Sequence, residues 1–280
     1  LEEGLGIRRD LRDRAGTAQV LNILGLVASD QGDFARAVAL HEEALALYRE
    51  MGDQYGIGNV LNNLGIVARE QGDVARATAL YSDSLRLFRE VGELRGITTA
   101  LHNLGRVAFD RGELDRAAAL YQESLAVRQQ IGDEVGAAMT LHNLGNVVAE
   151  QGDIGRAVAL YRESLMIRAD FGDKSALVRS FEDLAVFARL LGQPSQAVRL
   201  YGASTALRDL LGSPVPPADE ERYGGILSWA RDRLGAEAAD ACLAAGRAMG
   251  QDAAVEDALA FLRRAERHAS VAGAKDHASE

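Results

Sequence analysis

A repeat of 40 residues, split into two halves of 20, is the feature that most constrains the fold of this chain. A short motif that begins at Leu21 returns at Leu61, Leu101 and Leu141, and a degenerate copy begins at Phe181. Glycine stands at every twentieth position, at Gly32, Gly52, Gly72, Gly92, Gly112, Gly132, Gly152, Gly172, Gly192 and Gly212. Self-similarity at a fixed period of this size predicts a solenoid of stacked units.

Each half-repeat carries the signals of one helix. Glycine adopts the left-handed conformation that ends a helix, and an aspartate after it, such as Asp33, caps the next helix. Glu93 and Glu113 hold the same position and are poorer caps. No proline precedes Pro194, which favours helices because proline breaks their interior. We therefore expect an all-α fold with one helix of about 17 residues in each half.

Small residues recur where the two helices of a repeat meet. Glycine occupies one position of the first helix, and it costs roughly 1 kcal/mol relative to alanine inside a helix, so its recurrence predicts close backbone approach. These glycines are Gly25, Gly65, Gly105 and Gly145. His41 stands in a column otherwise occupied by tyrosine, and we expect its ring to pack in the core with one polar edge.

The repeat boundaries give a domain organisation. We expect a partial repeat at 1–12, repeats at 13–52, 53–92, 93–132 and 133–172, a degenerate repeat at 173–212, capping helices at 213–267 and a disordered tail at 268–280. The segment from Leu1 aligns with the second helix of a repeat, so we expect the chain to be a piece of a longer polypeptide.

The repeats resemble the tetratricopeptide repeat. The resemblance rests on Leu64-Gly65, Ala77, Tyr81 and Ser84, which recur 40 residues later. The family's usual repeat is 34 residues, and the longer form in this chain is similar to kinesin-light-chain-type repeats. The family's leading tryptophan is replaced by leucine, and its closing proline is missing. The resemblance implies a right-handed superhelical solenoid over residues 1–212, closed by a C-terminal helical cap.

The C-terminal part resembles a second, more specific group. Residues 200–212, Glu221-Arg222-Tyr223, Gly246-Arg247 and residues 256–260 are similar to the C-terminal region of bacterial LuxR-type and AfsR-like transcriptional regulators. Those proteins join a DNA-binding or cyclase-like domain and a STAND-type ATPase to C-terminal tetratricopeptide repeats. The resemblance implies that this chain is the sensory arm of such a regulator, with the ATPase and DNA-binding functions upstream of Leu1.

Composition and motifs exclude several classes of function. The net charge of the chain is −10 and neither half of the chain is basic, so we expect no direct contact with nucleic acid. No apolar run is long enough to span a membrane, and no signal-peptide pattern is present, so we expect a cytoplasmic protein. Phosphate-binding loop motifs are missing, and the single Cys242 excludes a multi-cysteine zinc site. We expect no enzyme activity, no cofactor and no metal site.

Polar residues on the first helix of each repeat are the candidate binding residues. At about 100° per residue they share an arc away from the apolar stripe, which the family resemblance places in the concave groove. The candidates are Asn22, Asn62, Asn63, Arg69, His102, Asn103, Arg106, His142, Asn143 and Asn146. Asparagine is a poor helix former, and its amide suits the backbone of an extended peptide. Alternatively, Asn63, Asn103 and Asn143 bond to adjacent repeats and fix the stacking. A metal shared by His102 and His142 lacks a third ligand.

The leading expectation is a non-enzymatic module that binds a protein or peptide segment in the groove and contacts other domains of its parent chain. Two alternatives stay open. One is a sensor of a small ligand or signal peptide, which predicts a closed, partly apolar pocket. The other is a stand-alone assembly scaffold without a parent ATPase.

Overall fold

The computed structural model describes residues 2–215 and 217–276, and within these it leaves out the side chains of 217–222 and 269–276. This part of the chain contains 14 α-helices and no strand, so the all-α prediction is confirmed. The helices group into two compact units, Leu1–Gly132 and Asp133–Glu280, which are described separately below. The division falls at a predicted repeat boundary.

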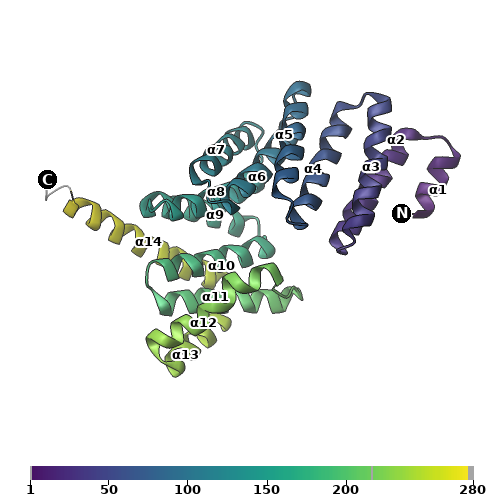
Figure 1. Ribbon diagram of the computed structural model, residues 1–280. Helices are drawn as coiled ribbons and strands as arrows, with labels where there is room; N and C mark the ends of the chain where they lie inside the picture. Colours follow the sequence, from purple (N-terminus) through teal and green to yellow (C-terminus); the bar gives the residue numbers. More distant parts are fainter. Residues whose placement is uncertain (1, 216, 277–280) are drawn as a thin grey trace. The chain divides into compact units, whose positions relative to one another are not determined.

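Unit 1 consists of a single helix followed by three helix pairs (Figure 1). Its helices are α1 (Glu2–Asp10), α2 (Arg14–Asp30), α3 (Phe34–Met51), α4 (Gln54–Glu70), α5 (Val74–Val91), α6 (Leu94–Asp110) and α7 (Leu114–Gln130). Helix α2 packs against α3, α4 against α5 and α6 against α7, as expected for repeats of two helices. Each pair then packs on the next through contacts of α3 with α4 and of α5 with α6.

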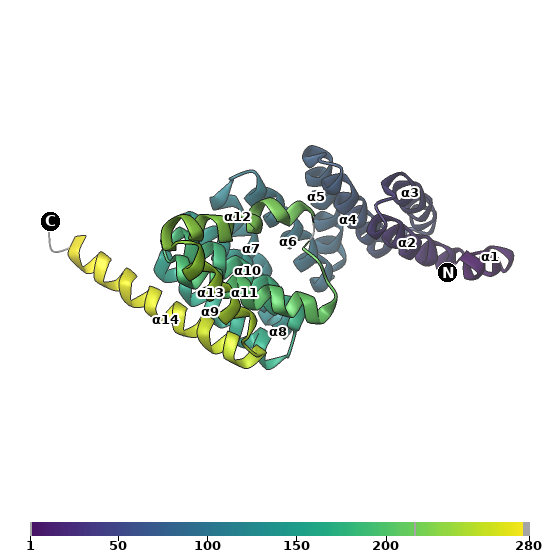
Figure 2. The same cartoon turned by 90° about the horizontal axis from the view of Figure 1, so that it is seen from below.

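Unit 2 contains two further helix pairs and three C-terminal helices (Figures 1 and 2). Its helices are α8 (Glu134–Glu150), α9 (Ile154–Asp170), α10 (Lys174–Leu190), α11 (Pro194–Leu211), α12 (Pro217–Leu234), α13 (Ala236–Arg247) and α14 (Gln251–Asp276). The pairs are α8 with α9 and α10 with α11. In both units the even-numbered helices from α2 to α10 are the first helices of the repeats.

The turns between helices follow the predicted chemistry. All ten glycines of the 20-residue series have a positive φ, from 61° at Gly212 to 87° at Gly152. The carboxylate of Asp33 accepts a hydrogen bond from the Arg36 N–H at 3.1 Å, and equivalent aspartates cap most of the following helices. Glu113 makes no side-chain cap bond, which agrees with its weaker prediction.

The glycines inside the first helices accommodate side chains, which corrects the expectation of close backbone approach. A Cβ atom on Gly65 would lie 2.6 Å from the ring of Tyr81, and one on Gly105 would lie 2.8 Å from the ring of Tyr121. His41 occupies the equivalent position over Gly25, is fully buried and shares a 2.9 Å hydrogen bond with Asn22, so its predicted core role is confirmed.

The C-terminal helices pack on the last repeats of unit 2. Helix α13 crosses α11 at close backbone distance, since a Cβ on Gly246 would lie 2.1 Å from the carbonyl oxygen of Arg199. Helix α14 packs against both α9 and α11. Arg162 of α9 pairs with Glu266 at 3.0 Å, and the ring of Phe261 lies 6.0 Å from that of Phe187. Helices α12, α13 and α14 therefore all belong to unit 2.

The predicted disordered tail needs a correction. Helix α14 continues to Asp276, so residues 268–276 are helical, and the remaining predicted tail, 277–280, lies outside the described residues. Residues 268–276 include three alanines and no proline, which suits a helix. Within the part of the chain that the structure describes, no helix has the length and hydropathy of a membrane span.

Candidate functional site

The asparagine rows of unit 1 form hydrogen bonds between successive repeats. The Asn63 amide donates to the Asn22 side-chain oxygen at 3.0 Å, and the Asn103 amide donates to that of Asn62 at 2.9 Å. In both pairs the residues are 41 positions apart, so each bond joins one even-numbered helix to the next. These bonds are the ones expected if the asparagines fix the stacking of adjacent repeats. Each bond uses only part of the hydrogen-bonding capacity of an amide.

The same register continues in unit 2 with different residues. His142 Nε2 lies 2.6 Å from Asp183 Oδ2, again 41 positions along the chain. Asp183 also accepts hydrogen bonds from the Asn146 amide at 3.3 Å and from the Tyr223 hydroxyl at 2.9 Å. Tyr161 donates in turn to Asn146 at 2.7 Å. The network ties α8, α9 and α10 to the C-terminal helix α12.

Burial separates the candidate residues into two groups. Asn62 and His142 are only 6% and 1% exposed, so the prediction that they line an open groove is wrong: both lie beneath the surface in the network between helices. Arg106 is exposed, and the other candidates are half-buried, namely Asn22, Asn63, Arg69, His102, Asn103, Asn143 and Asn146. Arg69 pairs with its neighbour Glu70 at 2.5 Å.

The histidines of this region are neutral at pH 7. Burial lowers the pKa of His41 to about 4. The pKa of His102 is also lowered to about 4, first by burial and then by the charges of Arg128, Arg106 and Arg69. Burial lowers the pKa of His142 as well, against the opposing effect of the Asp183 hydrogen bond. Among the described residues no group of three histidines, cysteines or acids is placed to hold a metal ion.

A column of arginines near the ends of the second helices was not among the predicted residues. Tyr48 and Phe88 hold this position in the first two repeats. In the next three repeats the same position is arginine: Arg128, Arg168 and Arg208. The change of residue type at a fixed repeat position was the sequence signal. Burial lowers the pKa of Arg168 to about 10, so its guanidinium stays charged at pH 7.

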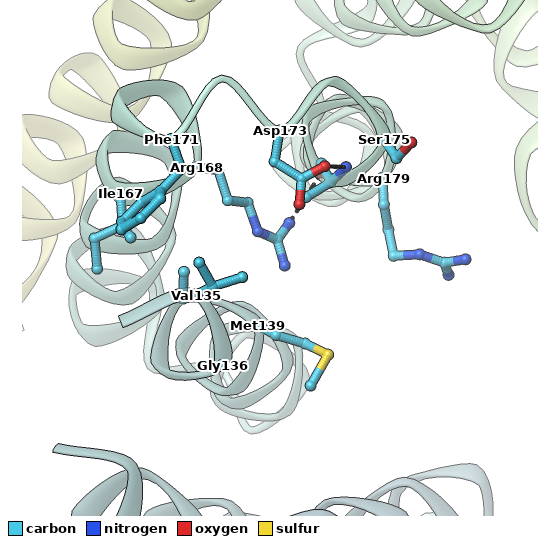
Figure 3. Close-up of a pocket in the computed structure, with 11 residues that line it drawn as sticks. Val135, Gly136, Met139, Ile167, Arg168, Phe171, Asp173, Ser175 and Arg179 are labelled. Atoms are coloured by element: carbon cyan, nitrogen blue, oxygen red, sulfur yellow. Dashed lines mark hydrogen bonds between the residues drawn. The ribbon is translucent and has the colours of Figure 1, made fainter. Parts of the chain in front are cut away.

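The guanidinium of Arg168 lies at the base of a pocket in unit 2 (Figure 3). It donates to the Ala176 carbonyl oxygen at 3.1 Å and to the Ser180 hydroxyl at 2.5 Å. The pocket has a volume of about 380 Å³ and lies between α8 and α10, over the last turn of α9. Its apolar walls include Val135 and Met139 of α8.

Arg179 of α10 supplies the exposed charge of this pocket. Its side chain makes no hydrogen bond or ion pair with the described residues, and Figure 3 shows it extending into the same open space as Met139. Asp173, which also lines the pocket, accepts a bond from the Ala176 N–H at 3.0 Å and caps α10. The arrangement suits binding of an amphiphilic group.

Family and fold comparisons agree with the repeat architecture. A family model described as tetratricopeptide repeat matches residues 16–90, 56–130, 96–170 and 136–209. A search of curated proteins found no match.

Solved structures share the fold at low sequence identity. BtubC (BKLC) from P. vanneervenii has a TM-score of 0.64 at 21% identity, over 77% of this chain and 91% of that chain. A putative kinesin light chain with nearly identical repeats from Podosopora anserina gives 0.54 at 18%, over 68% and 94%. A Rap protein complexed with competence and sporulation factor gives 0.58 at 14%, over 94% and 76%. At these identities the likeness establishes the fold.

Proposed function

Because the chain belongs to the tetratricopeptide repeat family, we propose that it is a non-enzymatic module that binds a protein or an extended peptide segment. The binding surface is the exposed side of the even-numbered helices, taken in each unit by itself. Repeat solenoids of this kind use such surfaces for partners. The similar Rap protein was crystallised with competence and sporulation factor, which is consistent with this role.

The pocket of unit 2 is the observation that carries the proposal. Val135 and Met139 are 50% and 36% exposed and line the same pocket as Arg179, whose guanidinium has no ion-pair partner among the described residues. Exposed apolar side chains around a few polar groups are typical of binding sites. No catalytic constellation of nucleophile, base and orienting group accompanies them among the described residues.

The asparagines contribute to binding in addition to stacking. An asparagine amide has two N–H donors and an oxygen acceptor, so one bond to the adjacent repeat leaves further capacity. Asn63 and Asn103 are half-buried and therefore reachable from the exposed side. We assign the free capacity of these amides, and that of Asn143 and Asn146, to the backbone of the bound segment.

Selection of peptides followed by mutation tests this function. Heptapeptides are selected from a phage-displayed random library on the immobilised chain, and their Kd is measured by fluorescence anisotropy. Asn103→Ala and Asn143→Ala are expected to weaken binding by about tenfold, the effect of one or two hydrogen bonds, with unchanged circular dichroism. Gln122→Ala, at an exposed position of α7, is the control. No selected peptide, or unchanged affinity in both variants, contradicts the proposal.

We also propose that the module is the C-terminal arm of a cytoplasmic bacterial transcriptional or signalling regulator of the LuxR family. The support is the sequence resemblance of residues 200–260. Binding would then bias a parent ATPase between its off and on states. The coding sequence upstream of Leu1 tests this: a STAND-type ATPase followed by unbroken repeats supports the proposal, and its absence leaves a stand-alone scaffold.

A sensor of a small ligand or signal peptide is a second candidate, favoured by the pocket of about 380 Å³. Such a ligand stabilises the folded state by an amount that grows with the logarithm of its concentration above its Kd. A thermal-shift screen of small organic acids and short peptides separates the two candidates. Stabilisation by a small molecule, lost in Arg179→Gln, favours the sensor.

A further inference from the structure

We propose that helix α12 is a built-in ligand of the fifth repeat, and that a partner helix with the same anchor side chains displaces it. This inference rests on the proposed binding function and goes beyond it by naming the kind of partner and the segment with which that partner competes. All the residues that carry it belong to unit 2.

A hydrogen bond places α12 on the side of α10 that we assign to partner binding. The hydroxyl of Tyr223 donates to the carboxylate of Asp183 at 2.9 Å. Asp183 stands at the repeat position that Asn103 holds in unit 1, and Asn103 is one of the proposed binding residues. In the fifth repeat a side chain of α12 therefore occupies the place that the bound segment would take in the other repeats.

A second contact of α12 falls on another of the proposed binding positions. The guanidinium carbon of Arg189, on α10, lies 5.8 Å from the centre of the Trp229 ring, and this ring is half-buried. Arg189 stands at the repeat position of Arg69. A guanidinium over an indole ring is a favourable cation–π pair, so α10 holds α12 through an aromatic contact as well as a hydrogen bond.

The buried face of α12 has the pattern of a helical ligand. Tyr223, Ile226 and Ala230 are spaced by three and four residues, so they share one face of the helix, and all three are fully buried. Helix α12 packs against α10, α11 and α13. Apolar anchors at this spacing are typical of an amphipathic helix bound in a groove. The expected partner is therefore an amphipathic helix with a tyrosine, an aliphatic residue three positions later and a tryptophan three positions after that.

Two adjacent glycines weaken α12 without a packing requirement. A Cβ atom on Gly224 would meet nothing within 4 Å, and one on Gly225 would lie at an ordinary contact distance of 3.6 Å from Arg189. Both positions could therefore carry alanine, which is the better helix former. Helix α13 differs, because a Cβ on its Gly246 would lie 2.1 Å from a backbone oxygen of α11. A weak α12 beside a closely packed α13 suits exchange of α12 for a partner helix.

Binding of the α12 sequence as a separate peptide is the test. The probe is a fluorescein-labelled peptide of residues 217–234, and its Kd for the full chain is measured by fluorescence anisotropy. Ile226→Asp in the chain places a charge at a buried anchor and is expected to expel α12 from its site. The peptide should bind this variant about tenfold more tightly, or better, than the wild-type chain, whose tethered α12 competes at high effective concentration.

A milder variant keeps the test valid if the buried charge disturbs the repeat. Tyr223→Phe in the chain removes only the hydroxyl bonded to Asp183 and should raise the affinity for the peptide by about three- to tenfold. Hydrogen exchange of α11 and α13 is measured in both variants, and unchanged protection there shows that the fifth repeat is still folded.

Substitutions in the peptide test the anchors. The peptide with Tyr223→Phe is expected to bind the Ile226→Asp chain about tenfold more weakly, because it lacks the bond to a buried carboxylate. The matched control is the peptide with Asp232→Asn, at an exposed position of α12, which should bind as the original peptide does.

A glycine substitution tests the weakness of α12. Gly224→Ala in the chain is expected to slow hydrogen exchange within α12 by about fivefold, because alanine favours the closed helix. The matched control is Gly6→Ala in α1, which also meets nothing within 4 Å and should leave exchange in α12 unchanged.

Three outcomes overturn the inference: no binding of the peptide to either chain variant, equal affinity of the peptides with tyrosine and phenylalanine, or unaltered exchange of α12 in Gly224→Ala. If library-selected peptides bind and the α12 peptide does not, this inference fails while the proposed function stands. If the α12 peptide alone binds, the helix site stands and the asparagines are not the binding residues. If neither binds, both proposals fail.

Discussion

The imidazole of His142 and the carboxylate of Asp183 lie 2.6 Å apart, both almost fully buried, at the 41-residue spacing that joins Asn22 to Asn63 in unit 1. One repeat position thus carries two kinds of bond, between neutral amides in unit 1 and to a buried acid in unit 2. The acid also receives the hydroxyl of Tyr223, which links the C-terminal helices to the last repeat.

Removing the buried acid is expected to destabilise unit 2. Asp183→Ala leaves His142, Asn146 and Tyr223 without their shared acceptor, and the loss is expected to be about 3 kcal/mol of unfolding free energy. Urea unfolding followed by circular dichroism measures it. The control is Asp170→Ala at an exposed position, which should change stability by less than about 0.5 kcal/mol. Equal effects of the two variants would contradict the structural role of the network.

Tyr223→Phe is expected to loosen α12 while the repeats stay folded. The substitution removes one hydroxyl bonded to a buried carboxylate, worth about 2 kcal/mol. Hydrogen exchange should become faster in Pro217–Leu234, and the peptides of unit 1 serve as the internal reference. Unaltered exchange in α12 would show that its position does not depend on this bond.

Adding a methyl group at Gly65 is expected to be destabilising. The new Cβ would lie 2.6 Å from the Tyr81 ring, and overpacking of this kind costs about 1–3 kcal/mol. Gly6→Ala, in the interior of α1, meets nothing within 4 Å and should instead stabilise its helix by up to about 1 kcal/mol. Thermal unfolding of the two variants should therefore shift in opposite directions; a shared direction would refute the packing argument.

Stability is expected to fall between pH 7 and pH 5 because of His41. The folded pKa is about 4 and the unfolded value 6.5, so in this range the unfolded chain binds more protons. The free energy of unfolding therefore decreases as the pH falls, by about 2 kcal/mol for this residue. His41→Tyr, which matches Tyr81 in its column, should remove that part of the pH dependence, as measured by urea unfolding at both pH values.

The control for this titration is Gln122→Ala, at an exposed position of α7 without a titratable side chain, which should leave the pH dependence unchanged. The same slope in wild type and His41→Tyr would show that the buried imidazole is not its source.

The arginine column gives a compensation experiment. Tyr48 and Phe88 pack over glycines, whereas Arg168 faces Ala176. Arg168→Phe should therefore destabilise unit 2 by about 2 kcal/mol through overpacking. Adding Ala176→Gly should recover about 1 kcal/mol despite the poorer helix propensity of glycine. Additive effects in the double variant would exclude a direct contact between the two positions.

Much of this fold was predictable because the repeat shows each local signal several times. Glycine and aspartate at fixed spacing determine where helices end and begin, and the column of Tyr81 identified His41 as a core residue. The end of α14 was missed because no glycine and acid pair marks it.

The candidate site was less predictable, since the same amide serves two purposes. An asparagine on a helix surface can bond to the next repeat or to a ligand, and only the distance from Asn103 to Asn62 shows the first use. The pocket depends on Val135, Phe171 and Arg179, which belong to three different helices or turns. Their proximity follows from the packing of α8, α9 and α10, which a linear pattern does not reveal.

Helix α14 changes how the last two repeats of unit 2 lose their structure. In a simple array each repeat contacts only its neighbours, so terminal repeats open one at a time. Helix α14 packs against α9 of the fourth repeat and against α11 of the fifth repeat. Opening either repeat therefore removes part of the surface on which α14 packs, and this weakens the packing of α14 on the other repeat. These two repeats and α14 should therefore unfold cooperatively, whereas the helix pairs of unit 1, which have no such shared helix, can open in sequence.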